Sequence, residues 1–286
     1  MQNLFLLATK NNLHDSLLTN QEKLAVCYHD LFDYPLTLAE LIKWQPSQKI
    51  PFEKEINVST KGGYYHVDSR EGLIYKRILR KRISAKKMLI AKKAAKVLSY
   101  VLTIKLIALT GSLAMQNSSE DGDIDLMIVT KSNSLWTTRI FAYLVLSICH
   151  LPFRRPFDKK QKDRLCLNMW LDENDLAWKK SDRNLYTAHE IAQIVPLVNK
   201  NKTYEKFLQI NKWILDFWPN SVKIGKWKIN GKWKLGNGKS SLLEKFCYRI
   251  QYNHMKSKMT REVVSLTRAL FHPQDWGKVV INRLTT

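Results

Sequence analysis

The sequence predicts an α+β protein in which a central region of alternating strands and helices lies between two mainly helical regions. Residues 102–200 contain three apolar, strand-like segments separated by helical patterns, which is typical of an α/β domain with its functional residues at the strand ends. The residues before this region predict helices and a hairpin, and those after it are mostly helical. With 286 residues, 45% of them hydrophobic, the chain is long enough for two domains and a sizeable core.

Residues 1–70 are predicted to form a winged-helix-like domain. Thr37 and Glu40 have the spacing of a capping box, which opens a helix that runs to about Trp44. The expected elements are helices over 13–18, over 21–31 with Asn20 as N-cap, and over 37–44, then a hairpin of strands 56–58 and 64–67 around Lys61-Gly62-Gly63. This region has three possible roles: it reads DNA, it packs on the next domain, or it docks a partner.

Residues 71–100 predict a basic linker helix. Between its ends lie ten Lys or Arg residues and no acid: Lys76, Arg77, Arg80, Lys81, Arg82, Lys86, Lys87, Lys92, Lys93 and Lys96. Its expected inner stripe is Ile78, Leu79, Ile83, Leu89, Ile90 and Ala94. A charge run is usually a solvated face, but a run of a single sign favours contact with a phosphate backbone.

Residues 101–200 are predicted to form the domain that carries the chemistry. The expected strands are Leu102–Leu109, Asp123–Val129 and Arg164–Leu171, and the expected helices are Ser112–Gln116, with Ser112 as a cap, Leu135–Cys149 and Leu185–Val198. The longest apolar run, Ile140–Phe153, is too short to span a bilayer comfortably. We therefore expect a buried helix there and no membrane partner.

Residues 201–286 predict a helical C-terminal region with a Trp/Lys hairpin. The expected helices are Thr203–Phe217, Leu242–Met255 and Arg261–Phe271. In the hairpin of 225–235, one face would hold Trp227, Trp233 and Leu235 and the other Lys226, Lys228, Lys232 and Lys234. Such a flap either covers core with its tryptophans or lies over a polyanionic substrate.

Charge and cysteine usage narrow the class of partner. The formal net charge of +22 favours polyanions, namely nucleic acid, nucleotide phosphates or anionic lipid, although a lysine-rich surface without function is the simpler interpretation. The four cysteines are widely spaced and form no metal-binding pattern, so zinc is not expected. With no secretory signal ahead of them, they suggest reduced thiols in a cytoplasmic protein.

The most informative stretch runs from Leu109 to Val129. An apolar strand ends in Gly111-Ser112, and ten residues later a second strand opens with Asp123-Ile124-Asp125. Because strand side chains alternate, the two aspartates point the same way with α-carbons roughly 6.6 Å apart. Carboxylates at that distance can share hard divalent cations, and a Gly-Ser turn offers N–H groups and a hydroxyl to phosphate oxygens.

The Gly-Ser turn, the ten-residue gap and Asp123-Ile124-Asp125-Leu126, with their flanking apolar strands, resemble the nucleotidyltransferase superfamily typified by DNA polymerase β. The wider arrangement is similar to a group of microbial proteins with a winged-helix-like segment before a nucleotidyltransferase domain and a helical tail after it. The resemblance implies a mixed-sheet nucleotidyltransferase fold over residues 101–200.

The resemblance also implies an enzyme that moves a nucleoside monophosphate from a nucleoside triphosphate to an acceptor, with release of pyrophosphate. Asp123 and Asp125 would be the catalytic residues that hold Mg²⁺, and Gly111 and Ser112 would bind the β- and γ-phosphates. The acceptor and the preferred base are not indicated, and nucleic acid is a further expected partner.

One position departs from the family pattern. Members that catalyse carry a third carboxylate on a later strand, and the corresponding residue here is Asn168, a weak magnesium ligand. Asp172 or Glu173 at the end of that strand would be substitutes. The alternative function is therefore a catalytically weakened nucleotidyltransferase-fold protein that acts as a nucleic-acid-binding or nucleotide-sensing regulator.

Four further residues are weaker candidates. His189 and Glu190 would contact substrate, although a lone helical histidine is more often structural. Arg154 and Arg155 would reach phosphate, although solvated arginines are the default.

Overall fold

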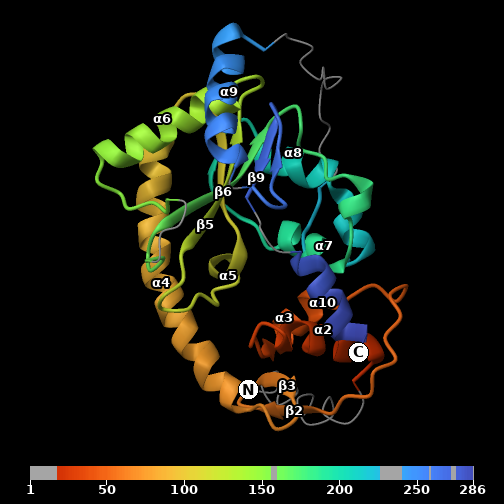
Figure 1. Ribbon diagram of the computed structural model, residues 1–286. Helices are drawn as coiled ribbons and strands as arrows, with labels where there is room; N and C mark the ends of the chain where they lie inside the picture. Colours follow the sequence, from red (N-terminus) through yellow and green to blue (C-terminus); the bar gives the residue numbers. More distant parts are fainter. Residues whose placement is uncertain (1–17, 156–159, 226–239, 258, 272–274, 286) are drawn as a thin grey trace.

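The structure is a computed structural model that describes residues 18–155, 160–225, 240–257, 259–271 and 275–285 (Figure 1). It is an α+β fold around a six-stranded mixed sheet. The strand order is β7 (Val195–Asn199), β4 (Ile104–Leu109), β5 (Ile124–Thr130), β6 (Leu165–Asp172), β9 (Arg268–Leu270) and β8 (Val263–Val264). β5 and β6 are parallel, and the other neighbours are antiparallel.

Helices cover both faces of this sheet, because side chains alternate along its central strands. On one face, Leu126 and Ile128 pack in a cluster with α4 (Gly72–Leu98), α6 (Leu135–Ile148) and α9 (Leu242–Lys256). On the other face, Met127 and Val129 pack in a cluster with α7 (Leu185–Ala192), α8 (Thr203–Ile210) and α10 (Trp276–Thr285). Asp125 is two residues before Met127, so its side chain lies on the same face of the sheet as that of Met127, the α7 side.

The N-terminal region adds a second, three-stranded sheet. Its elements are α2 (Asn20–Asp30), β1 (Leu36–Thr37), α3 (Leu38–Lys43), β2 (Val58–Lys61) and β3 (Tyr64–Val67), with strand order β1-β3-β2. The capping box of Thr37 and Glu40 is confirmed, and Gly62 and Gly63 form the hairpin turn with positive φ. Residues 44–57 form no helix, so only the short α3 lies between α2 and the hairpin. The buried side chains of α2 belong to the same core cluster as α7 and α8.

Two local predictions in this region are wrong. Thr19, not Asn20, is the N-cap of α2, since its side chain accepts from the Glu22 N–H and Glu22 bonds back to the Thr19 N–H. The first hairpin strand begins at Val58 and extends to Lys61, because the two glycines alone form the turn. The helix expected over 13–18 lies outside the described residues, apart from Leu18.

The basic helix is confirmed as α4, but its expected inner stripe is confirmed only in part, at Ile90 and Ala94. Ile78, Leu79 and Leu89 are 40%, 44% and 68% exposed. Instead Lys87 is buried, where its Nζ donates to the Glu120 and Gly122 carbonyls at 3.0 and 2.7 Å and to Asp163 at 2.7 Å. The middle of α4 faces a loop whose carbonyl groups need donors, so a cation is buried where the apolar pattern predicts a leucine.

In two segments predicted as helices, part or all of the chain forms strands of the central sheet. The helix expected over Leu185–Val198 ends at Ala192, and β7 follows it beside β4. Pro196 explains the change, because proline breaks a helix interior but is tolerated on an edge strand. The helix expected over Arg261–Phe271 is the β8–β9 pair, and α10, which the sequence did not predict, follows it.

Three other expectations have mixed outcomes. The helix over 203–217 divides into α8 and a 3₁₀ turn at Lys212–Asp216. The prediction that the helix between Ile140 and Phe153 is buried is wrong. Four apolar side chains of α6 are between 42% and 66% exposed, namely Ile140, Phe141, Leu144 and Ile148. None of the described helices is long and apolar enough to cross a membrane. The hairpin expected at 225–235 lies outside the described residues, except for Gly225.

Candidate functional site

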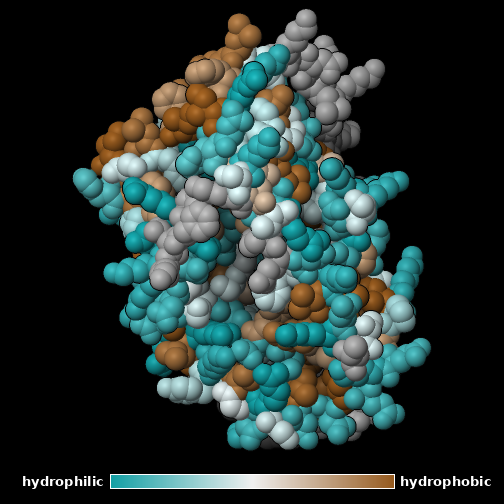
Figure 2. Space-filling model, viewed as in Figure 1, coloured by the Kyte–Doolittle hydropathy of each residue, from teal (hydrophilic) through white to brown (hydrophobic). Residues whose placement is uncertain are grey.

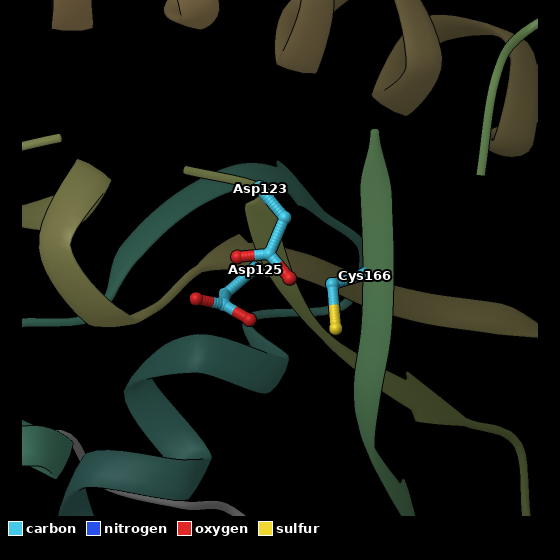
Figure 3. Close-up of side chains that lie close together, drawn as sticks. All are labelled: Asp123, Asp125 and Cys166. Atoms are coloured by element: carbon cyan, nitrogen blue, oxygen red, sulfur yellow. The ribbon is translucent and has the colours of Figure 1, made fainter. Parts of the chain in front are cut away.

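The two aspartates of the motif meet at the start of β5. Asp123 directly precedes the strand, and Asp125 is its second residue. Their side chains lie beside Cys166 of β6, and one ligand atom from each of the three lies within 4.8 Å of the others (Figure 3). The predicted convergence of Asp123 and Asp125 is therefore present.

A bulge in β6 brings Asn168 to the same site. Asp125 is opposite Cys166, whereas Met127 is opposite Met169, so β6 has one residue more than β5 between these pairs. The Asn168 Nδ2 donates to Asp125 Oδ1 at 2.6 Å. Its Oδ1 is buried and has no hydrogen-bond partner in the described part of the chain.

Arg154 joins the site from the segment after α6. Its guanidinium donates to Asp123 Oδ2 at 2.9 Å, and the Asp123 side chain is only 16% exposed. The Arg154 side chain is itself 39% exposed, so it is solvated as expected and also paired with Asp123. Sequence reasoning could not find this contact, because it depends on how the chain returns from α6 to β6.

Two carboxyl groups on the α7 side of the site have raised pKa values. Burial, together with the charge of Asp123, raises the pKa of Asp125 to about 7. Burial and the charge of Asp125 raise the pKa of Glu190 on α7 to about 8. The site therefore holds protons at neutral pH that a divalent cation would displace from Asp125.

Gly111 packs directly against Asp125. Its φ is +59°, and a Cβ there would lie 2.8 Å from Asp125 Oδ2, so only glycine fits without strain or displacement. Gly111 begins the four-residue helix α5 (Gly111–Ala114). Thr110 is its N-cap residue, so the prediction that Ser112 caps it is wrong. The Ser112 side chain is exposed.

A cavity of about 460 Å³ opens beside Gly111 and Ser112. It lies between the end of α2, α4, α5, α7 and α10, so three regions of the chain enclose it. Arg80 and Arg283 line it, as do the rings of Phe32 and Tyr186, which are 6.5 Å apart and inclined by 22°. The cavity thus has aromatic rings and both cationic and acidic side chains in its wall, since Asp33 and Glu190 also line it, and Gly111 connects it to Asp125.

The two histidines on the cavity wall are structural. His29 Nδ1 lies 2.8 Å from the Ala25 carbonyl, which can only accept, so this nitrogen carries the proton. His29 Nε2 then accepts from His189 Nε2 at 3.1 Å. Burial lowers the pKa of His29 to about 4 and that of His189 well below its usual value, so both rings are neutral. Glu190, the other weak candidate on α7, lies in the cavity wall near Asp125.

Asp172 and Glu173 lie at the far end of β6 and do not complete the site. Asp172 is opposite Thr130, five residues along β5 from Asp125. Its two oxygens accept from the backbone N–H groups of Asn133 and Asn174 at 2.6 and 2.9 Å. Glu173 accepts from Ser132. Both are held by the loop after β5.

The donors at the site fit one hard divalent cation. Two carboxylates are ligands of the type that Mg²⁺ takes, together with water and substrate phosphates, whereas Asn168 turns its NH2 group, which cannot coordinate a metal, toward Asp125. The Cys166 thiol does not fit, because burial raises its pKa and sulfur is a soft ligand. A third carboxylate within ligand distance is absent from the described residues. Cys166 was missed in the sequence, although its position two residues before Asn168 indicated the same strand face.

No protein-family model, curated protein or solved structure matches this chain. The geometry of the site therefore carries the functional argument.

Proposed function

We propose that this protein is a Mg²⁺-dependent nucleotidyltransferase that moves a nucleoside monophosphate from a nucleoside triphosphate to an acceptor. The observation that carries the proposal is the Asp123–Asp125 pair, because Asp125 lies against Gly111, and Gly111 lines a cavity large enough for a nucleotide. The resemblance of the motif to the DNA polymerase β-like superfamily supports the same reaction.

Each part of the site has a role in this proposal. Asp123 and Asp125 hold Mg²⁺, which neutralises triphosphate charge and favours the deprotonated acceptor when it is bound. The backbone around Gly111 and the Ser112 hydroxyl bind the β- and γ-phosphates. Arg80 and Arg283 add positive charge to the cavity wall. The acceptor oxygen forms a bond to the α-phosphorus, the bond to pyrophosphate breaks, and the acceptor proton passes to solvent.

A transfer assay tests the proposal. Nucleoside triphosphates labelled at the α-phosphate are incubated with the protein, Mg²⁺ and RNA, DNA, protein or small-molecule acceptors. We expect label on one acceptor class, and its loss in Asp123→Asn and Asp125→Asn but not in Asp121→Asn, an exposed loop control. The proposal fails if no label transfers and the two site variants leave triphosphate binding unchanged.

A second candidate is a catalytically weakened protein of this fold that binds nucleic acid or senses nucleotides. Asn168 in place of a carboxylate favours it, and so does a row of exposed cations on α4: Lys81, Arg82, Lys86, Lys92, Lys93 and Lys96. This candidate predicts nucleic-acid affinity that falls steeply with salt and does not need the aspartates. Neutralising Lys81, Arg82 and Lys86 would weaken binding, whereas weak salt dependence would exclude this candidate.

A further inference from the structure

An apolar band lies across α6 and α9, on the face of the sheet away from the cavity. Figure 2 shows hydrophobic side chains gathered over α6 and the start of α9, at one end of the molecule. The apolar band consists of Ile140 (42% exposed), Phe141 (51%), Leu144 (50%), Ile148 (66%), Leu242 (85%), Leu243 (59%), Phe246 (62%) and Ile250 (53%). An exposed apolar patch of this size usually marks a surface that binds a partner protein or a membrane.

The charges beside the apolar band have one sign. Leu242, Phe246 and Ile250 follow one another at successive turns of α9, and helix geometry places Lys245 and Arg249 directly alongside them. Both side chains are exposed, and neither makes a side-chain hydrogen bond or ion pair with the described residues.

No exposed acid offsets these cations on the two helices. α6 contains no acidic residue, and the acid of α9, Glu244, is buried, where it accepts from the backbone N–H groups of Trp136 and Thr137. The charged residue of α6, Arg139, donates to Gln251 at 2.6 Å within the packing of the two helices. The apolar band therefore has a positive border.

We propose that the apolar band is a peripheral membrane surface that binds the headgroup region of an anionic bilayer. Amphipathic helices with an apolar face and flanking cations lie in this way at the interface of anionic membranes. The band projects from the end of the molecule, so a bilayer can meet it without a complementary groove (Figure 2). A second copy would instead bring Lys245 and Arg249 of both chains together, each chain with a net charge of +22.

This attachment differs from the sequence-based expectation of no membrane partner. That expectation rests on the length of the apolar run, which rules out a comfortable span but not a helix that lies on the surface. The cavity lies on the opposite face of the sheet, so it would stay open to water on a bound molecule. The inference is independent of the proposed enzymatic function.

Vesicle co-sedimentation of the full chain tests the proposal. The probes are phosphatidylcholine vesicles with or without phosphatidylglycerol, at about 150 mM and about 500 mM salt. We expect binding to the anionic vesicles that partly survives the higher salt. The triple variant Phe141→Ser/Leu144→Ser/Phe246→Ser should lower the partition coefficient at least about tenfold. Its matched control is Leu89→Ser/Leu102→Ser, whose side chains are 68% and 84% exposed elsewhere, and it should change binding less than about twofold.

Two further measurements keep the test decisive. Lys245→Ser/Arg249→Ser should reduce the preference for phosphatidylglycerol, and circular dichroism should show native helix content in every variant. Equal binding of the triple variant and the wild type, with all binding lost at the higher salt, would mean attraction by net charge alone and would overturn the proposal. A dimer in sedimentation velocity that the triple variant abolishes, without vesicle binding, would assign the band to a second copy instead.

Discussion

Asp125 and Asp172 lie on neighbouring strands, both are largely buried, and burial raises the pKa of both, to about 7 and about 6. Their partners differ. Asp172 is held by two backbone N–H groups, whereas Asp125 meets the Asn168 side chain, a second carboxylate and Gly111. Burial and a raised pKa therefore do not distinguish a functional carboxylate from a structural one. The groups that surround each carboxylate distinguish the two roles.

The largest expected effect is the loss of function in Asp125→Asn. Removing one of two carboxylates at the proposed cation site should lower nucleotidyl transfer at least about a hundredfold, because transition-state charge is no longer neutralised. The free energy of unfolding should stay the same or rise, since the variant removes a buried charge beside Asp123. Labelled transfer and thermal unfolding measure the two effects. A strongly destabilised variant would assign Asp125 a structural role like that of Asp172.

Asp172→Asn should show the reverse pattern. An amide has one acceptor oxygen, so one of the two backbone N–H groups loses its acceptor, at a cost of about 2 kcal/mol in unfolding free energy. Affinity for a nucleoside triphosphate should change less than about twofold, because Asp172 is opposite Thr130 at the other end of the strand pair. Denaturant unfolding and nucleotide titration check this prediction. A large loss of affinity with unchanged stability would break the comparison.

Gly111→Ala and Gly62→Ala form a matched pair. Both glycines have nearly the same φ, +59° and +58°, so alanine at either should destabilise by about 1–2 kcal/mol. Only Gly111 has a neighbour for the new Cβ, and that neighbour is the movable end of Asp125 at 2.8 Å. Magnesium-dependent nucleotide affinity should therefore fall in Gly111→Ala alone. Equal affinities in the two variants would show that contact with Gly111 does not position Asp125.

The last expected effect is on stability alone, through its dependence on pH. The folded state raises the pKa of Asp125 from 3.8 to about 7, so it binds this proton more tightly than the unfolded chain does. The associated stabilisation is complete below about pH 4 and is lost as pH rises from there through 7, by up to about 4 kcal/mol. Asp125→Asn should remove this part of the slope between pH 4 and 7, as measured by denaturant unfolding across that range. An unchanged slope would mean that Asp125 titrates normally in the folded protein.

Short-range features of the fold and site could be predicted from the sequence. The capping box at Thr37, the strands beside Gly111 and the shared face of Asp123 and Asp125 depend on residues that are near one another in the chain. β7 and the β8–β9 pair could not be predicted in this way, because each takes its strand identity from a partner far along the chain. The same holds for Arg154, which reaches Asp123 from a separate segment.

Predictions from the apolar pattern of the sequence were wrong at some positions in α4 and β6. The apolar spacing of α4 predicts an inner stripe, but the loop before Asp123 requires a donor, so Lys87 is buried and Leu89 is exposed. In β6, strict alternation of side chains between the two faces would assign Met169 and the residues after it to the wrong faces. The bulge puts both Asn168 and Met169 on the α7 side. These departures follow from hydrogen-bond needs that a single strand or helix does not reveal.

The most direct test of the central claim is calorimetric titration of a non-hydrolysable nucleoside triphosphate with Mg²⁺ or with EDTA. The account predicts that Mg²⁺ tightens binding at least about tenfold in the wild type and in Asp172→Asn, but not in Asp125→Asn. Equal Mg²⁺ dependence in all three proteins, or none in the wild type, would contradict it.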